Sequence, residues 1–156
     1  MKRSPHYVFV TEWEIPAPVE RVWNELMAPE RWPEWWRGVV RVETLDAGRP
    51  DGCGAIRRYT WRSRLPYRLT FIMETTKIEP RRLIEGRASG ELDGRGCWQL
   101  SAAGAGTHVR YDWEVGVTKN WMKRLDPIAR PLFGWNHDVV MEWGRIGLIQ
   151  RVKRTT

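Results

Sequence analysis

The sequence that decides the fold is WEIPAPVERVW at residues 13–23, followed by the tryptophan-rich run RWPEWW at residues 31–36. Before Pro16, residues 6–15 alternate and place Tyr7, Phe9, Thr11, Trp13 and Ile15 on one side of an extended chain. This pattern is typical of a half-buried strand. The stretch therefore begins as a strand that Pro16 ends.

Residues 18–28 change to a helical pattern. Val19, Val22, Trp23 and Leu26 recur at helical spacing, and a proline such as Pro18 is tolerated in the first turn. The sequence predicts a short helix here, which Pro29 closes. Residues 30–36 predict one further short turn of helix, interrupted by Pro33.

Residues 38–118 are typical of consecutive strands separated by turn residues such as Asp, Gly and Pro. The connections are too short for crossover helices, so the sheet should be antiparallel. In the last strand, Val109, Tyr111, Trp113, Val115 and Val117 should face inward. Gly94 and Gly96 are interpreted as turn residues of a hairpin. The six strands are predicted at 38–45, 54–63, 67–78, 82–90, 95–102 and 107–117.

The last third predicts a long core-facing helix over residues 125–150. Pro131 removes a backbone donor, so we expect a kink or break there, or a helix that starts at Pro131 itself. Met141 and Leu148 should project outward. A helical wheel gathers the inward stripe from Leu125, Ile128, Leu132, Trp135, Asn136, Val139, Val140, Trp143, Ile146 and Gly147.

The order of these elements resembles the START-like superfamily (SRPBCC, polyketide cyclase/dehydrase-like) with its helix-grip fold. Four segments carry the resemblance: Ile15 to Trp23, the step Trp35-Trp36, Leu83 to Leu92 with Gly96-Cys97-Trp98, and Trp135 to Asp138 with Gly144 and Gly147-Leu148. The resemblance implies an α+β fold, in which a curved antiparallel seven-stranded sheet wraps around a long C-terminal helix, with one or two short helices after strand 1. It also implies a cavity between sheet and helix that holds an apolar or amphipathic small molecule. The superfamily includes lipid carriers, hormone receptors and aromatase/cyclases.

Size and charge limit the remaining classes. With 156 residues and 42% hydrophobic content, we expect one domain, residues 1–156. The net charge of +7 favours anionic partners, but the cations are scattered, so we expect no nucleic acid. Weak contact with an anionic membrane surface is a further hypothesis, drawn from the charge and from Met141 and Leu148. No apolar run reaches about 20 residues and no signal peptide is evident, so we expect a cytoplasmic location.

Catalytic and metal-binding templates are missing from the sequence. It contains no GxSxG, no HExxH and no glycine-rich phosphate loop. Cys53 and Cys97 have no CxxC spacing, so we expect free, buried thiols, no metal and no cofactor. Two functions stay open: a carrier or binding module for a hydrophobic, lipid-like or polyketide-like molecule, and an aromatase/cyclase or dehydratase acting on a polyketide or related carbonyl chain.

Several side chains are candidates for the cavity wall. Asn136 lies in the apolar stripe, where a hydrogen bond to sheet backbone or water competes with a ligand contact. His137 is predicted at the surface or a helix end. One face of strand 54–63 carries Arg57, and one face of strand 82–90 carries Glu85 and Arg87; the sequence does not decide whether either face is concave. The predicted ligand-binding residues are Trp36, Arg57, Tyr59, Trp61, Trp98, Tyr111, Trp113, Asn136 and Val140.

Overall fold

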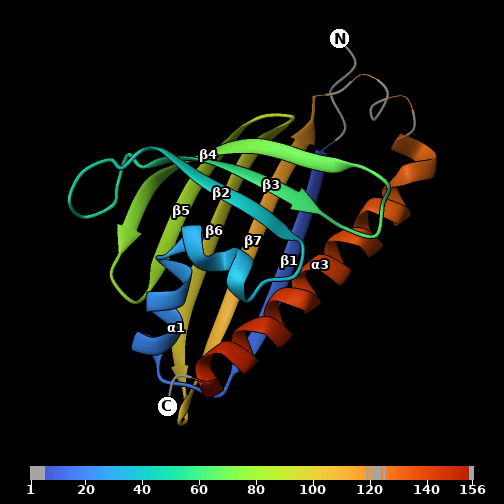
Figure 1. Cartoon of the computed structure of the whole chain (residues 1–156). Helices are drawn as coiled ribbons and strands as arrows, with labels where there is room; N and C mark the ends of the chain where they lie inside the picture. The colour runs from blue at the N-terminus through green and yellow to red at the C-terminus, as the bar shows by residue number, and fades with distance from the viewer. Residues whose placement is uncertain (1–5, 119, 121–123, 125, 155–156) are drawn as a thin grey trace.

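A computed structural model describes residues 6–118, 120, 124 and 126–154. Its element order is the one that the sequence predicts, with strand bounds shifted by at most three residues (Figure 1). The elements are β1 (His6–Ile15), α1 (Val19–Leu26), the 3-10 helix η1 (Pro29–Glu34), β2 (Val39–Asp46), β3 (Ile56–Arg62), β4 (Arg68–Glu79), β5 (Leu83–Gly90), β6 (Leu92–Ala103), β7 (Gly106–Val117) and α3 (Asp126–Arg154).

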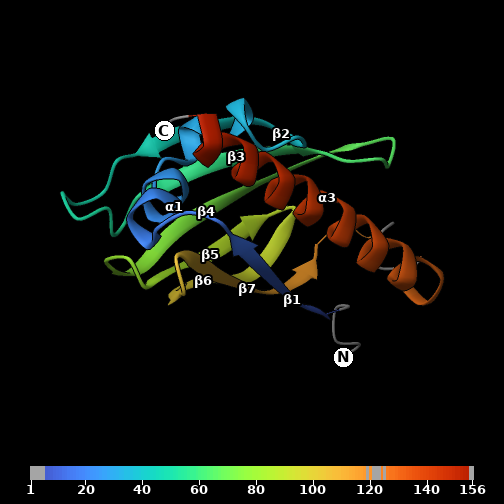
Figure 2. The same ribbon diagram turned by 90° about the horizontal axis from the view of Figure 1, so that it is seen from below.

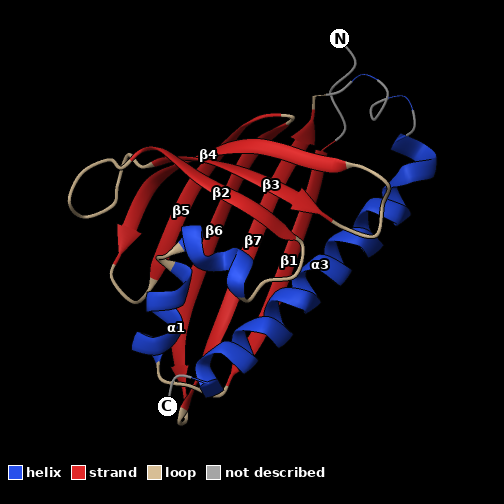
Figure 3. Cartoon of the chain, viewed as in Figure 1, coloured by secondary structure: helices blue, strands red, loops and turns tan. Residues whose placement is uncertain are grey.

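The seven strands form one antiparallel sheet in the order β1-β7-β6-β5-β4-β3-β2. Each strand pairs with its sequence neighbour except β1, which pairs with β7. The sheet curves, and α3 crosses its concave side, with α1 and η1 near the C-terminal end of α3 (Figures 2 and 3). The protein therefore has the predicted helix-grip fold.

The inward faces of β1 and β7 follow the predicted alternation. Trp13 and Ile15 of β1 are buried, as are Val109, Trp113 and Val115 of β7. Their outward neighbours are polar or exposed. Of these two strands, β1 at the edge of the sheet is the one that packs against α3.

The interpretation of Gly94 and Gly96 as turn residues is wrong. Both lie inside β6, where they pair with Ala88 and Gly86, and the chain reverses earlier, at Gly90 and Glu91. A Cβ at position 96 would lie 2.3 Å from the Tyr111 hydroxyl oxygen. The glycine at this position is needed for close packing and not for a turn.

The predicted orientation of α3 is wrong in part: Asn136, Val140 and Gly147 do face inward, but other positions do not. Met141 and Leu148 are buried, at 5% and 0% exposure, whereas Ile128, Leu132, Trp135 and Ile146 are exposed. The contact face is rotated by more than roughly a third of a turn from the centre of the predicted stripe. The predicted stripe is centred on large apolar side chains and leaves out Gly144, whereas the true contact face includes both Gly144 and Gly147. Leu125 lies outside the described residues, and the helix runs through Pro131 without a break.

Two glycines bring the C-terminal half of α3 into contact with the tryptophan-rich run. A Cβ at Gly147 would lie 1.8 Å from the Trp35 carbonyl oxygen, and one at Gly144 would lie 2.4 Å from Cε2 of Trp36. The Trp36 indole Nε1 donates a hydrogen bond of 2.9 Å to the Val140 carbonyl. No larger residue fits at these two positions without moving the helix.

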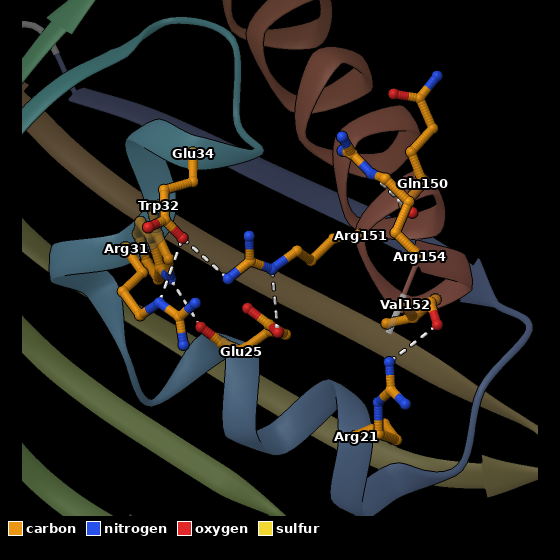
Figure 4. Close-up of polar contacts among 9 residues, drawn as sticks. All are labelled: Arg21, Glu25, Arg31, Trp32, Glu34, Gln150, Arg151, Val152 and Arg154. Atoms are coloured by element: carbon orange, nitrogen blue, oxygen red, sulfur yellow. Dashed lines mark hydrogen bonds and ion pairs between the residues drawn. The ribbon is translucent and has the colours of Figure 1, made fainter. Parts of the chain in front are cut away.

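Polar contacts fix the same end of α3 to α1 and η1 (Figure 4). Arg151 lies 3.2 Å from Glu25 and 2.8 Å from Glu34, and Arg21 donates a hydrogen bond of 2.8 Å to the Val152 carbonyl. Arg151 and Glu25 are both mostly buried. The C-terminal end of the helix is therefore held by packing and by charge together.

Candidate ligand-binding site

Two cavities lie beneath the helices, on the concave side of the sheet. The larger has a volume of about 180 Å3 and is lined by residues of β1, β3, β4, β6, β7, η1 and the middle of α3. The smaller, of about 90 Å3, lies between the sheet and the α1–η1 region. The indole rings crowd this space without filling it.

An aromatic partition separates the two cavities. Trp32, Trp61, Phe71, Trp98 and Tyr111 contribute to the walls of both. Trp98 and Tyr111 stack with ring centroids 4.1 Å apart and an interplanar angle of 26°. Rigid rings on both sides of the partition give each cavity a defined shape.

All nine predicted ligand-binding residues line one of these cavities, and their role in binding stays a prediction. Seven line the larger one: Trp36, Trp61, Trp98, Tyr111, Trp113, Asn136 and Val140. Arg57 and Tyr59 line the smaller one, where Trp61, Trp98 and Tyr111 also contribute.

Arg57 brings a charge to the smaller cavity, and it is already paired. Its Nε lies 2.6 Å from Glu30, which also accepts a hydrogen bond of 2.6 Å from the Thr44 hydroxyl. Burial acts to raise the pKa of Glu30, but these two donors outweigh it, so the pKa is lowered. The carboxylate is ionised at neutral pH and offsets the Arg57 charge.

Glu85 and Arg87 do not add charge to the larger cavity. Their alternate neighbours Gly86 and Ala88 are buried, so Glu85 and Arg87 belong to the convex face of β5. Glu85 borders the smaller cavity, yet its carboxylate lies 3.7 Å from the Arg95 guanidinium on β6. The structure thus resolves the two open faces: that of Arg57 is concave and that of Arg87 is convex.

Tyr59 and Tyr111 keep their hydroxyl protons. Burial raises the pKa of both phenols well above the ordinary value. Each therefore presents a neutral hydroxyl that can donate or accept a hydrogen bond inside the site.

The prediction that places His137 at the surface is wrong. Its side chain is 14% exposed and lines the larger cavity, with its ring stacked on Phe9 at a centroid distance of 4.2 Å. Burial lowers the pKa of His137 to about 4, although the neighbouring Asp138 acts to raise it. The imidazole is neutral at pH 7.

Several buried polar atoms in this region have no hydrogen-bond partner in the described part of the chain. They include Oδ1 of Asn136, both ring nitrogens of His137 and the indole Nε1 of Trp61. Asn136 Oδ1 therefore accepts no hydrogen bond from the sheet backbone. Leaving one such atom without a partner costs about 1–3 kcal/mol. Three unpartnered side chains around one cavity are a mark of a binding site.

The sequence contains a signal for the inward position of His137. His137 precedes Met141, Gly144 and Leu148 at spacings of four, seven and eleven residues, which is one face of a helix. Recognising the glycines as contact points places His137 on the inner face. Phe9 and Phe133 are not among the predicted site residues, and both line the larger cavity.

Comparison with known proteins agrees with this architecture. The model of the family described as polyketide cyclase / dehydrase and lipid transport matches residues 7–151. The chain belongs to this family, within the START-like (SRPBCC) superfamily. A search of curated proteins finds no significant match.

Solved structures with the same fold are distant in sequence. A START superfamily protein of Mycobacterium smegmatis has a TM-score of 0.79 at 17% identity, with 97% of this chain and 100% of that chain covered. The Zhui aromatase/cyclase of Streptomyces sp. R1128 has a TM-score of 0.76 at 15% identity, covering 96% of this chain and 95% of that one. The protein TTHA0849 of Thermus thermophilus has a TM-score of 0.74 at 16% identity, covering 93% and 99%. At these identities the similarity shows the fold alone.

Proposed function

We propose that the protein binds a small hydrophobic or amphipathic molecule in the larger cavity. The observation that carries this proposal is an aromatic-lined space of about 180 Å3 beneath α3. An apolar cavity of about 150 Å3 is enough to hold a benzene ring, so this one suits a compact ring compound or a short acyl chain. Burial of apolar surface, at about 25 cal/mol per Å2, supplies the affinity.

The side chains that line the two cavities have two roles in the proposed binding: some form apolar walls and others offer polar contacts. Trp36, Trp98 and Trp113 provide flat apolar walls, and Val140 forms part of the wall on α3. Tyr111 and Asn136 offer polar atoms that orient a ligand. Arg57, across the partition, is paired through Nε with Glu30, and its remaining guanidinium N–H groups can bind the polar end of a longer molecule that reaches the smaller cavity.

Filling the cavity tests the proposal. Val140→Trp places an indole into the larger cavity and should weaken binding of toluene, measured by calorimetry, at least tenfold, because toluene loses its space. The matched control is Ile146→Trp, on the outer face of the same helix, where the side chain is exposed. Equal binding to both variants and to the wild type would reject this cavity as the site. Native mass spectrometry of freshly purified protein would reveal a retained ligand.

The aromatase/cyclase alternative has its support in the family and in the likeness to the Zhui fold. No observation of this chain favours it over binding, so it stays a prediction. The lack of nucleic-acid binding and a cytoplasmic location also stay predictions. Weak contact with an anionic membrane surface now depends on the net charge alone, because Met141 and Leu148 are buried. None of the described helices is long and apolar enough to cross a membrane.

A further inference from the structure

The wall that α3 presents to the larger cavity contains a pair of adjacent polar side chains. Asn136 and His137 both line the cavity, and Trp61 lines it from β3. Asn136 Oδ1, the two His137 nitrogens and Trp61 Nε1 are all buried and without a hydrogen-bond partner in the described part of the chain. The nearest charged group to the imidazole is the exposed Asp138 carboxylate, 3.8 Å from His137 Nδ1 and beyond hydrogen-bond distance. The rest of the wall is mainly aromatic and aliphatic.

These atoms form a mixed set of donors and acceptors. Asn136 Oδ1 accepts, Trp61 Nε1–H donates, and a neutral imidazole offers one donor and one acceptor. The imidazole ring lies flat on Phe9, with an interplanar angle of 12°. This stacking fixes the plane of the imidazole ring. A polar group of the ligand must therefore lie close to that plane to form a hydrogen bond with a ring nitrogen.

The charges of the cavity wall indicate which kind of polar group the ligand carries. Among the described residues that line the larger cavity, Arg62 is the one permanently charged side chain, and it is exposed. The described wall therefore offers no buried cation to an anionic group, and burying an unpaired charge is strongly unfavourable. A hydroxyl is neutral and both donates and accepts hydrogen bonds, so it matches the set.

We infer that the larger cavity selects a neutral hydroxylated aromatic molecule, whose ring lies among the indoles and whose hydroxyl is bound by Asn136 and His137. This inference rests on the proposed function and names the chemistry of its ligand. Trp61 supplies a further donor from β3. The preference for a hydroxyl arises because the polar atoms of the wall are already buried without a hydrogen-bond partner. A ligand that has no hydroxyl leaves these atoms without a partner.

Binding of three ligands with one shared skeleton tests the inference. Toluene, p-cresol and p-toluate differ only in the group on the ring and can be titrated by calorimetry. We expect p-cresol to bind at least tenfold more tightly than toluene, and p-toluate to bind most weakly. In Asn136→Leu and His137→Phe, the preference for p-cresol should fall to less than threefold, with toluene binding retained. Gln150→Leu, at an exposed position of α3, is the control and should keep the full preference.

The possible results distinguish a failure of this inference from a failure of the proposed function. If toluene and p-cresol bind equally, or if p-toluate binds most tightly, the inference fails while the cavity remains a binding site. If none of the three binds, the proposed function fails for ligands of this size. If either variant does not fold, as judged by circular dichroism, His137→Gln and Asn136→Ser replace it. Because Gln and Ser keep a donor and an acceptor, these variants should keep a preference for p-cresol of more than threefold, and its loss would contradict the inference.

Discussion

The two halves of α3 differ in how they meet the rest of the protein. From Met141 to Val152 the inner face is buried, and glycines allow the backbone to touch the tryptophan-rich run. From Ile128 to Val140 the inner face is only half-buried and lines the larger cavity, while large apolar side chains face outward. One end of the helix thus fixes the fold, and the other end encloses the space in which we place a ligand.

Glycine substitutions in the two halves should have opposite effects. A Cβ at Gly147 would lie 1.8 Å from the Trp35 carbonyl oxygen, so Gly147→Ala should lower the free energy of unfolding by more than about 4 kcal/mol or prevent folding. At Gly134 the nearest atom to such a Cβ is Phe9 Cε1, at 4.0 Å. Gly134→Ala should therefore be neutral or stabilise the helix by up to about 1 kcal/mol. Urea denaturation measures both, and similar losses would mean that the halves are packed alike.

The buried histidine should make stability depend on pH. The pKa of His137 is about 4 in the folded protein and near 6.5 when unfolded, so the unfolded state binds more protons between these values. Stability should then fall by about 2 kcal/mol as the pH drops from 7 to 4.5. His137→Phe should remove this component and, at pH 7, stabilise the ligand-free protein by relieving two unpartnered nitrogens. Denaturation at both pH values tests this. The raised pKa of His108 acts in the opposite direction but is common to both proteins.

The ion pairs at the packed end should contribute more than those on the free surface. Arg151→Met leaves the mostly buried Glu25 without this cation and should lower the free energy of unfolding by about 1.5 kcal/mol. The control is Arg145→Met, which removes a pair with Glu142 within the same helix, between side chains that are 36% and 51% exposed. Its effect should not exceed about 0.5 kcal/mol. Thermal melting would detect the difference as a shift of a few degrees. If both variants lowered the free energy of unfolding equally, the Arg151 contacts would contribute no more than a surface ion pair.

The sequence by itself determined the order of elements, the antiparallel sheet and the inward faces of β1 and β7. These features depend on local periods of two and 3.6 residues, which are visible in any short window. It also identified nine residues that line the cavities, because large aromatic side chains on inward faces surround the hollow of such a sheet.

Only the tertiary structure decided how α3 is rotated, and with it the positions of His137, Met141 and Leu148. The helix is apolar on two sides, so side-chain hydrophobicity alone does not choose the contact face. The choice is made where the backbone approaches Trp35 and Trp36, since Gly144 and Gly147 leave room there for the indole rings and the chain beneath them. The same rotation brings His137 to the cavity wall beside Asn136, which the sequence already placed inward, because His137 lies about two to three turns before these glycines on the inner face.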